Sequence, residues 1–188
     1  MSKPRILHFV RHGAYEITPE SAKHGGILTA VGKRQARRTA RFFRGLPIKV
    51  VHTSDLWRAT QTAEIISEAL PKVPIRSTRL LREMIPTGLP GRRVRVPLKR
   101  RKESRDDLQK IIRRYFKPAR SVRHELVVCH GNLIRALTCT ALNVRLTAWY
   151  QMGTYNCSIT RFAVHGNGKI WLESFNETGH LTSSLITG

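Results

Sequence analysis

Acidic residues are scarce in this chain of 188 residues, which has 12 Asp and Glu against 34 Lys and Arg. The resulting formal net charge of +22 at pH 7 attracts polyanions of any kind, including nucleic acid, anionic lipid, acidic phosphoprotein and phosphorylated small molecules. The charge alone does not choose among them. Trp57, Trp149 and Trp171 are scattered along the sequence, so we expect no aromatic platform on which nucleic acid bases would stack.

Cysteine and long apolar runs are also in short supply. Cys129, Cys139 and Cys157 have no CxxC spacing, so the sequence predicts neither a disulfide framework nor a zinc site, and we interpret all three as small core residues. A reducing compartment follows, and we predict a cytoplasmic location, with organelle and nucleus as open alternatives. No apolar run is long enough to span a membrane, and the N-terminal residues lack the features of a secretory signal.

Short apolar segments and segments of helical periodicity alternate along the chain. The predicted strands are residues 5–10, 48–53, 73–78, 125–130, 157–165 and 169–176, of which the last two form a hairpin. The predicted helices are residues 29–45, with Thr29 as N-cap, 56–70, 107–117 and 131–143. This alternation predicts an α/β fold, a three-layer sandwich whose mostly parallel central sheet has helices on both faces, in a single domain spanning residues 1–188.

Two basic segments stand apart from this pattern. The predicted helix 29–45 carries arginines along one face, which we interpret as a solvated surface. Residues 86–106 predict an exposed loop insertion, because Pro, Gly and dense like charge disfavour a packed element. Residues 92–105 within it contain eight Lys and Arg and one acid, Glu103. This run fits a solvated loop, a site for an anionic partner or a nuclear targeting signal.

Cationic side chains and imidazoles follow the predicted strands at their carboxyl ends, where ligands bind in open α/β sheets. Arg11 and His12 follow the first strand, and His130 follows strand 125–130. Arg58 lies in the first turn of a helix, where a cation is unfavourable unless an anion binds nearby. Glu83, after Arg82, follows strand 73–78.

This set of residue types suits phosphoryl transfer. A neutral histidine can attack phosphorus and carry the phosphoryl group covalently, and arginines neutralise the charge of the transition state. A second, protonated histidine can donate to a phosphate oxygen. A carboxylic acid can protonate the leaving oxygen and then accept a proton from water.

Five motifs resemble those of the histidine phosphatase superfamily, which is also called phosphoglycerate mutase-like. They occur in the family's order and are RHG at 11–13, LTAVGKRQA at 28–36, SDLWRATQTAEII at 54–66, LLRE at 80–83 and HGNLIRAL at 130–137. The likeness is greatest to the branch of mitochondrial Ser/Thr protein phosphatases, although that branch's transmembrane anchor is missing and its acidic segment after LLRE is basic here. The long insertions of sugar-phosphate mutases are absent, which argues against mutase activity.

The resemblance implies a role for each matching residue. His12 corresponds to the nucleophile, and Arg11, Arg58 and His130 correspond to the phosphate pocket, with His130 also counted as catalytic. Glu83 corresponds to the acid/base. The resemblance implies a mechanism with no metal and no cofactor, through a phosphohistidine. Ala14 stands where the family often has a small polar residue.

We therefore predict a phosphomonoester hydrolase that acts on phosphoproteins at Ser or Thr. Within the same chemistry, the alternative is a phosphatase for phosphohistidine proteins or small sugar phosphates. From a different class, the alternative is an inactive pseudo-phosphatase that binds polyanions through its basic surface. The sequence does not fix the physiological substrate or the oligomeric state.

Overall fold

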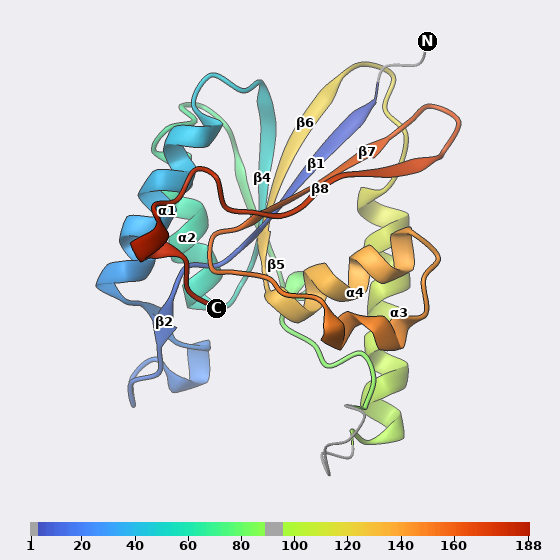
Figure 1. Ribbon diagram of the computed structural model, residues 1–188, viewed down its shortest axis with the longest axis horizontal. Helices are drawn as coiled ribbons and strands as arrows, with labels where there is room; N and C mark the ends of the chain where they lie inside the picture. The colour runs from blue at the N-terminus through green and yellow to red at the C-terminus, as the bar shows by residue number, and fades with distance from the viewer. Residues whose placement is uncertain (1–3, 89–95) are drawn as a thin grey trace.

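A six-stranded sheet forms the centre of the computed structural model, which describes residues 4–88 and 96–188 (Figure 1). The strand order is β5-β4-β6-β1-β7-β8. The first four of these strands are mutually parallel, whereas β7 runs antiparallel to β1 and β8 runs antiparallel to β7. The bounds are β1 (Arg5–Arg11), β4 (Ile48–Ser54), β5 (Ile75–Thr78), β6 (Arg123–Cys129), β7 (Ile159–Val164) and β8 (Ile170–Glu177). The predicted mostly parallel sheet is confirmed.

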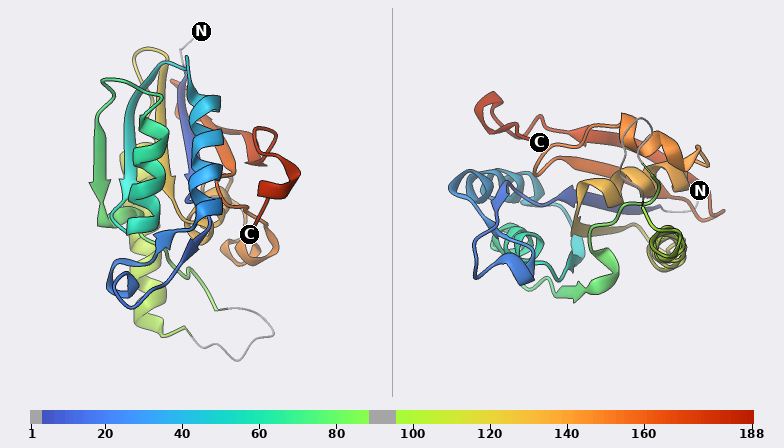
Figure 2. Two further views of the ribbon diagram at one scale, coloured as in Figure 1. Left: turned by 90° about the vertical axis from the view of Figure 1, so that its left-hand side faces the viewer. Right: turned by 90° about the horizontal axis from the view of Figure 1, so that it is seen from below.

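Helices cover both faces of this sheet (Figures 1 and 2). One face packs on α1 (Ala30–Phe43) and α2 (Trp57–Ser67), and the other packs on α3 (Leu98–Tyr115) and α4 (Gly131–Ala141). Two core clusters result, one on each side, so the predicted three-layer arrangement is confirmed. None of the helices in the described ranges is both long enough and apolar enough to cross a membrane.

The alternation of side chains along β1 shows how one strand serves both cores. Leu7 and Phe9 belong to the cluster under α3 and α4, and Val10 belongs to the cluster under α1 and α2. All three are fully buried. Successive side chains of a strand point to opposite faces, so a strand buried on both faces is apolar throughout. This is why residues 5–10 read as an almost continuous apolar run.

Short elements complete the fold around the carboxyl ends of the parallel strands. Thr29 caps α1 as predicted, because its hydroxyl accepts a hydrogen bond from the Gly32 amide at 3.1 Å. The short elements are the strand pair β2 (Tyr15–Glu16) and β3 (Ile27–Leu28) and the 3-10 helices η1 (Ala22–His24), η2 (Arg79–Leu81), η3 (Leu146–Gln151) and η4 (Ser183–Leu185).

The predicted loop over residues 86–106 is wrong for its second half, because α3 begins at Leu98 and not at residue 107. Arg101 and Ser104 are half-buried and continue, at helical spacing, the stripe formed by the buried Leu108 and Ile111. Polar residues within this stripe hid the periodicity from sequence reasoning, and Lys and Arg are themselves good helix formers. Of the basic run 92–105, residues 96–105 are described and residues 92–95 lie outside the described ranges.

Candidate active site

The sheet brings His12 and His130 together, because they directly follow the neighbouring parallel strands β1 and β6. The register pairs Arg11 with Cys129, so the two histidines occupy equivalent positions at the same edge. Their ring centroids are 5.1 Å apart. The carboxyl ends of parallel strands therefore meet here as the sequence predicted.

Hydrogen bonds fix the tautomer of His12. The Nε–H of Arg58 can only donate, and it lies 3.0 Å from His12 Nε2, so Nε2 is unprotonated and accepts this hydrogen bond with its lone pair. The other ring nitrogen, Nδ1, carries the proton and donates to the carbonyl of Gly13 at 2.9 Å. The imidazole thus presents an unprotonated Nε2 to the arginine side of the pocket.

The electrostatic surroundings of His12 keep it neutral. Its residue surface is only 2% exposed. Burial lowers the pKa of His12 to about 3, and the positive charges of Arg58 and Arg11 act in the same direction. A histidine in this state is a nucleophile across the neutral pH range.

His130 contacts the same guanidinium as His12. Its Nδ1 accepts from Arg58 Nη2 at 3.1 Å, and its Nε2–H donates to the hydroxyl of Ser54 at 2.9 Å. Burial lowers the pKa of His130 well below its usual value, and the neighbouring His12, Arg58 and Arg11 lower it further. The structure therefore favours the neutral form of His130 over the protonated form expected from the sequence.

The two predicted arginines line the same pocket. Arg58, buried in the first turn of α2, contacts both histidines and also donates to the carbonyl of Gly25. Its guanidinium lies 4.6 Å from the ring centroid of Tyr15, which covers it as a cation–π partner. Arg11 donates to the carbonyl of Thr154. The pocket therefore gathers two cations around an uncharged imidazole.

Glu83 lies at the rim of this pocket, in the segment after η2. Its residue surface is exposed, yet protein atoms crowd the carboxyl, and this desolvation raises its pKa. The Met84 amide donates to Glu83 Oε1 at 3.1 Å, and this bond, together with the charges of Arg58 and Arg11, opposes part of the rise. The structure thus brings all five predicted site residues to one edge of the sheet.

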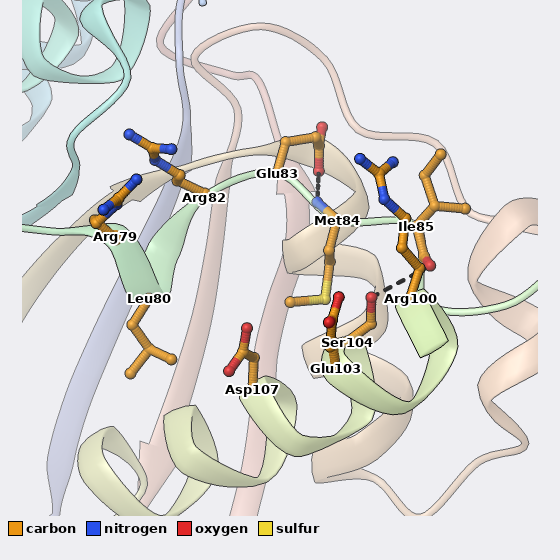
Figure 3. Close-up of a pocket in the computed structure, with 10 residues that line it drawn as sticks. All are labelled: Arg79, Leu80, Arg82, Glu83, Met84, Ile85, Arg100, Glu103, Ser104 and Asp107. Carbon is orange, nitrogen blue, oxygen red and sulfur yellow. Dashed lines mark hydrogen bonds between the residues drawn. The ribbon is translucent and has the colours of Figure 1, made fainter. Parts of the chain in front are cut away.

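A hollow of about 410 Å³ opens beside Glu83, between the segment after η2 and α3 (Figure 3). Arg79, Arg82 and Arg100 line it together with the acids Glu103 and Asp107. The hollow thus carries charges of both signs.

Arg82 pairs with Asp55 and not with its sequence neighbour Glu83. Its Nε and Nη2 donate to the two carboxylate oxygens of Asp55 at 2.6 and 2.8 Å. This bidentate pair connects the segment before Glu83 to the loop between β4 and α2. Arg82 therefore positions the chain that carries Glu83.

Sequence reasoning missed the polar residues that support the pocket from behind. Asn156 Nδ2 donates to the His12 carbonyl at 3.0 Å, and Gln35 Oε1 accepts from the Ala14 amide at 2.7 Å. Arg135 stands on α4, where its charge acts on Glu83 and Arg11. Gln35 and Arg135 had a sequence signal, since Gln35 lies in the LTAVGKRQA motif and Arg135 lies in the HGNLIRAL motif.

Within residues 4–88 and 96–188, no three His, Cys, Asp or Glu side chains are grouped so that they could hold a metal ion. The three cysteines are all buried and free, as predicted.

Comparison with known proteins assigns the class. A family model of the histidine phosphatase superfamily (branch 1) matches residues 7–106 and 90–178. The chain therefore belongs to the histidine phosphatase superfamily, and the predicted family is confirmed.

Two of the relatives that this chain resembles are mitochondrial protein phosphatases. The mitochondrial serine/threonine-protein phosphatase Pgam5 of Caenorhabditis briggsae is 33% identical over 194 residues, which cover 97% of this chain and 66% of that protein. The protein of the same name from Homo sapiens is 30% identical over 192 residues, with the same two coverages of 97% and 66%. The chain thus spans slightly less than two thirds of the length of these relatives.

Solved structures confirm the phosphoglycerate mutase-like fold. A phosphoglycerate mutase from Plasmodium falciparum superposes with a TM-score of 0.66 at 27% identity, covering 96% of this chain and 93% of that one. YhfR of Bacillus stearothermophilus superposes with a TM-score of 0.75 at 21% identity, covering 95% and 100%.

Proposed function

We propose that this chain is a phosphomonoester hydrolase whose covalent intermediate is a phosphohistidine on His12. The proposal rests mainly on the protonation state of His12. Its ring is buried and neutral, and the lone pair of its Nε2 points toward Arg58. Membership of the histidine phosphatase superfamily supports the same chemistry.

The reaction proceeds in two displacements. The phosphate of the substrate takes the place of the Arg58–histidine contacts and receives hydrogen bonds from Arg58, Arg11 and His130. The incoming dianion raises the pKa of His130 and so favours its protonated, donating form. His12 Nε2 then forms a bond to phosphorus while the ester P–O bond breaks, and Glu83 gives its proton to the leaving oxygen.

The second displacement restores the enzyme. Glu83, now a carboxylate, removes a proton from water, whose oxygen attacks phosphorus as the N–P bond breaks. Inorganic phosphate leaves, and Glu83 is again protonated. Throughout, the Gly13 carbonyl accepts from Nδ1–H and stabilises the positive charge that the ring carries while it holds the phosphoryl group.

For the substrate class, we propose phosphoproteins modified at Ser or Thr. The relatives at 30% and 33% identity are named serine/threonine-protein phosphatases. The hollow beside Glu83 supports this choice, because the part of a substrate beyond the leaving oxygen would enter a groove with charges of both signs. Phosphohistidine proteins and sugar phosphates are the alternatives within the same chemistry.

Three further predictions stay proposals. The two cores draw on residues from Leu7 to Phe175, and Leu185 near the C-terminus is also buried, which supports a single domain over residues 1–188. We also propose that the basic run 92–105 binds an anionic partner, because it contains eight Lys and Arg and one acid. The cytoplasmic location stays a prediction, and the mitochondrial relatives favour an organellar location as its rival.

The test is the variant His12→Ala, assayed on p-nitrophenyl phosphate and on phosphoserine, phosphothreonine and phosphohistidine peptides and sugar phosphates. We expect kcat/KM to fall by at least about 10⁴-fold, because the nucleophile is lost. His165→Ala, a histidine on the far hairpin, serves as control and should stay within about twofold.

Circular dichroism verifies that both variants fold. Activity of His12→Ala equal to that of the wild type would refute the mechanism and favour the pseudo-phosphatase. Preference for sugar phosphates over all peptides would refute the proposed substrate class.

A further inference from the structure

A second basic hollow lies on the flank of the molecule, between α1 and the C-terminal segment that contains η4. Figures 1 and 2 show this segment, in dark red, lying against α1. The hollow has a volume of about 270 Å³. The residues that line it are Arg34, Arg37, Arg38, Arg41, Thr182, Ser184 and Leu185.

The four arginines form one face of α1. Positions separated by three, four and seven residues lie above one another on a helix, and Arg34, Arg37, Arg38 and Arg41 have this spacing. All four side chains are exposed. The opposite face of α1 is buried through Ala36 and Ala40, so the body of the helix separates this hollow from the sheet.

These arginines lack the partners that other arginines of the chain have. Among the residues that the structure describes, no carboxylate lies within 4.0 Å of any of the four, and none of them has a side-chain hydrogen bond. By contrast, Arg82 pairs with Asp55 and Arg161 pairs with Glu173. Like charges at adjacent helical positions repel one another, and a bound anion removes that repulsion.

The other wall of the hollow supplies a neutral donor. The hydroxyls of Thr182 and Ser184 are exposed and share one hydrogen bond of 3.2 Å, so one hydroxyl proton is left for a ligand. Hydroxyls and guanidinium groups are the side chains that donate to phosphate oxygens. The lining contains no aromatic ring, so nothing there could stack on a nucleic acid base.

We propose that this hollow is a second, non-catalytic binding site for a small anion with several phosphate groups. Four arginines that line one hollow match several negative charges, and the volume suits a small molecule rather than a folded partner. The inference goes beyond the proposed hydrolase, since it involves none of the residues assigned to the reaction.

The experiment is a titration of the full chain with sodium tripolyphosphate at about 0.15 M salt, followed by amide NMR signals. In the wild type, the signals of residues 182–185 should shift and saturate. Arg37→Gln/Arg38→Gln should weaken this binding by about tenfold or more, because two charge-assisted donors are lost. Its activity on p-nitrophenyl phosphate should be retained.

The matched control is Arg76→Gln/Arg113→Gln, which removes the same charge from exposed positions on β5 and α3. It should bind tripolyphosphate as the wild type does at residues 182–185. The amide spectrum itself reports whether each variant is folded.

Three results would overturn the proposal: no shift of signals 182–185 in the wild type, equal binding by Arg37→Gln/Arg38→Gln, or equal weakening by the control. A phosphopeptide that binds through Arg37 and Arg38 where tripolyphosphate does not would also refute the small-anion class. None of these outcomes bears on the His12→Ala assay, so the two proposals fail separately.

Discussion

A single guanidinium, that of Arg58, contacts both pocket histidines. It donates to Nε2 of His12 and to Nδ1 of His130. Burial is the main cause of the lowered pKa of both rings, and the charge of Arg58 lowers both further. A cation in the first turn of a helix is otherwise unfavourable, so its position indicates an anion site. The same charge that helps to keep His12 unprotonated therefore also attracts its substrate.

At the residue scale, we predict that Glu83→Gln distinguishes substrates by their leaving groups. An alkoxide needs a proton to depart, whereas p-nitrophenolate does not. The variant should lose about 10²- to 10⁴-fold in kcat on a phosphoserine peptide and much less on p-nitrophenyl phosphate. Steady-state kinetics on both substrates measure this difference, and Glu103→Gln, from the same hollow, is the control. Equal losses on the two substrates would remove Glu83 from its role as acid.

The dependence of the rate on pH follows from the same residues. Desolvation raises the pKa of Glu83, and its acid form declines as pH rises through that raised value. The value of kcat/KM for a phosphoserine peptide should therefore fall on the alkaline side. On the acid side, activity should persist until pH approaches the His12 pKa of about 3, where Nε2 gains a proton.

A pH profile of the wild type and of Glu83→Gln measures both limbs. The alkaline decline should be absent from the variant. A decline of the same midpoint in both proteins would assign it to another group.

At the scale of elements, the loop after β1 and the start of α1 touch through backbone. A Cβ at Gly32 would lie 2.0 Å from the carbonyl oxygen of Ala14, and one at Gly13 would lie 2.7 Å from the carbonyl oxygen of Gly32. Neither contact leaves room for a side chain, and moving either backbone segment would cost stability. The approach of α1 to the catalytic loop thus depends on glycine at both positions.

We predict that Gly32→Ala displaces the loop that carries His12. The variant should lose about 1–3 kcal/mol of unfolding free energy through overpacking, and kcat should fall by about tenfold to hundredfold through misplacement of the nucleophile. Denaturant unfolding and steady-state kinetics measure the two effects. Gly179→Ala, where a Cβ has no neighbour within 4 Å, should change neither. Unaltered kinetics in Gly32→Ala would show that the loop is not held by this contact.

The sequence predicted the site residues that follow strands or lie in motifs. It did not predict the residues that reach the site only through tertiary contacts. His12 and His130 were recognised because each follows a buried strand. Asn156 could not be recognised, since it lies 144 residues from His12, whose carbonyl it binds. The start of α3 was missed because Arg101 and Ser104 occupy positions of its inner stripe.

At the scale of the whole molecule, the net charge of +22 creates a field that concentrates anionic substrates. Salt screens such a field. We predict that raising the salt concentration from about 0.05 to about 0.5 M increases KM for an acidic phosphopeptide by about tenfold and changes kcat by less than about twofold. Steady-state kinetics across salt concentrations measure this effect. A KM that does not respond to salt would show that the field does not contribute to substrate capture.

Phosphoryl transfer through the Nε2 atom of His12 requires that a phosphohistidine forms during turnover. The most direct measurement is rapid quenching of the wild-type protein with labelled substrate, followed by mass spectrometric mapping of the labelled peptide. We predict one phosphoryl group that is labile in acid, stable in base and located on His12, and absent from His12→Ala. A stable label on any other residue, or turnover without a trapped phosphoenzyme under conditions where hydrolysis is slowed, would contradict the account.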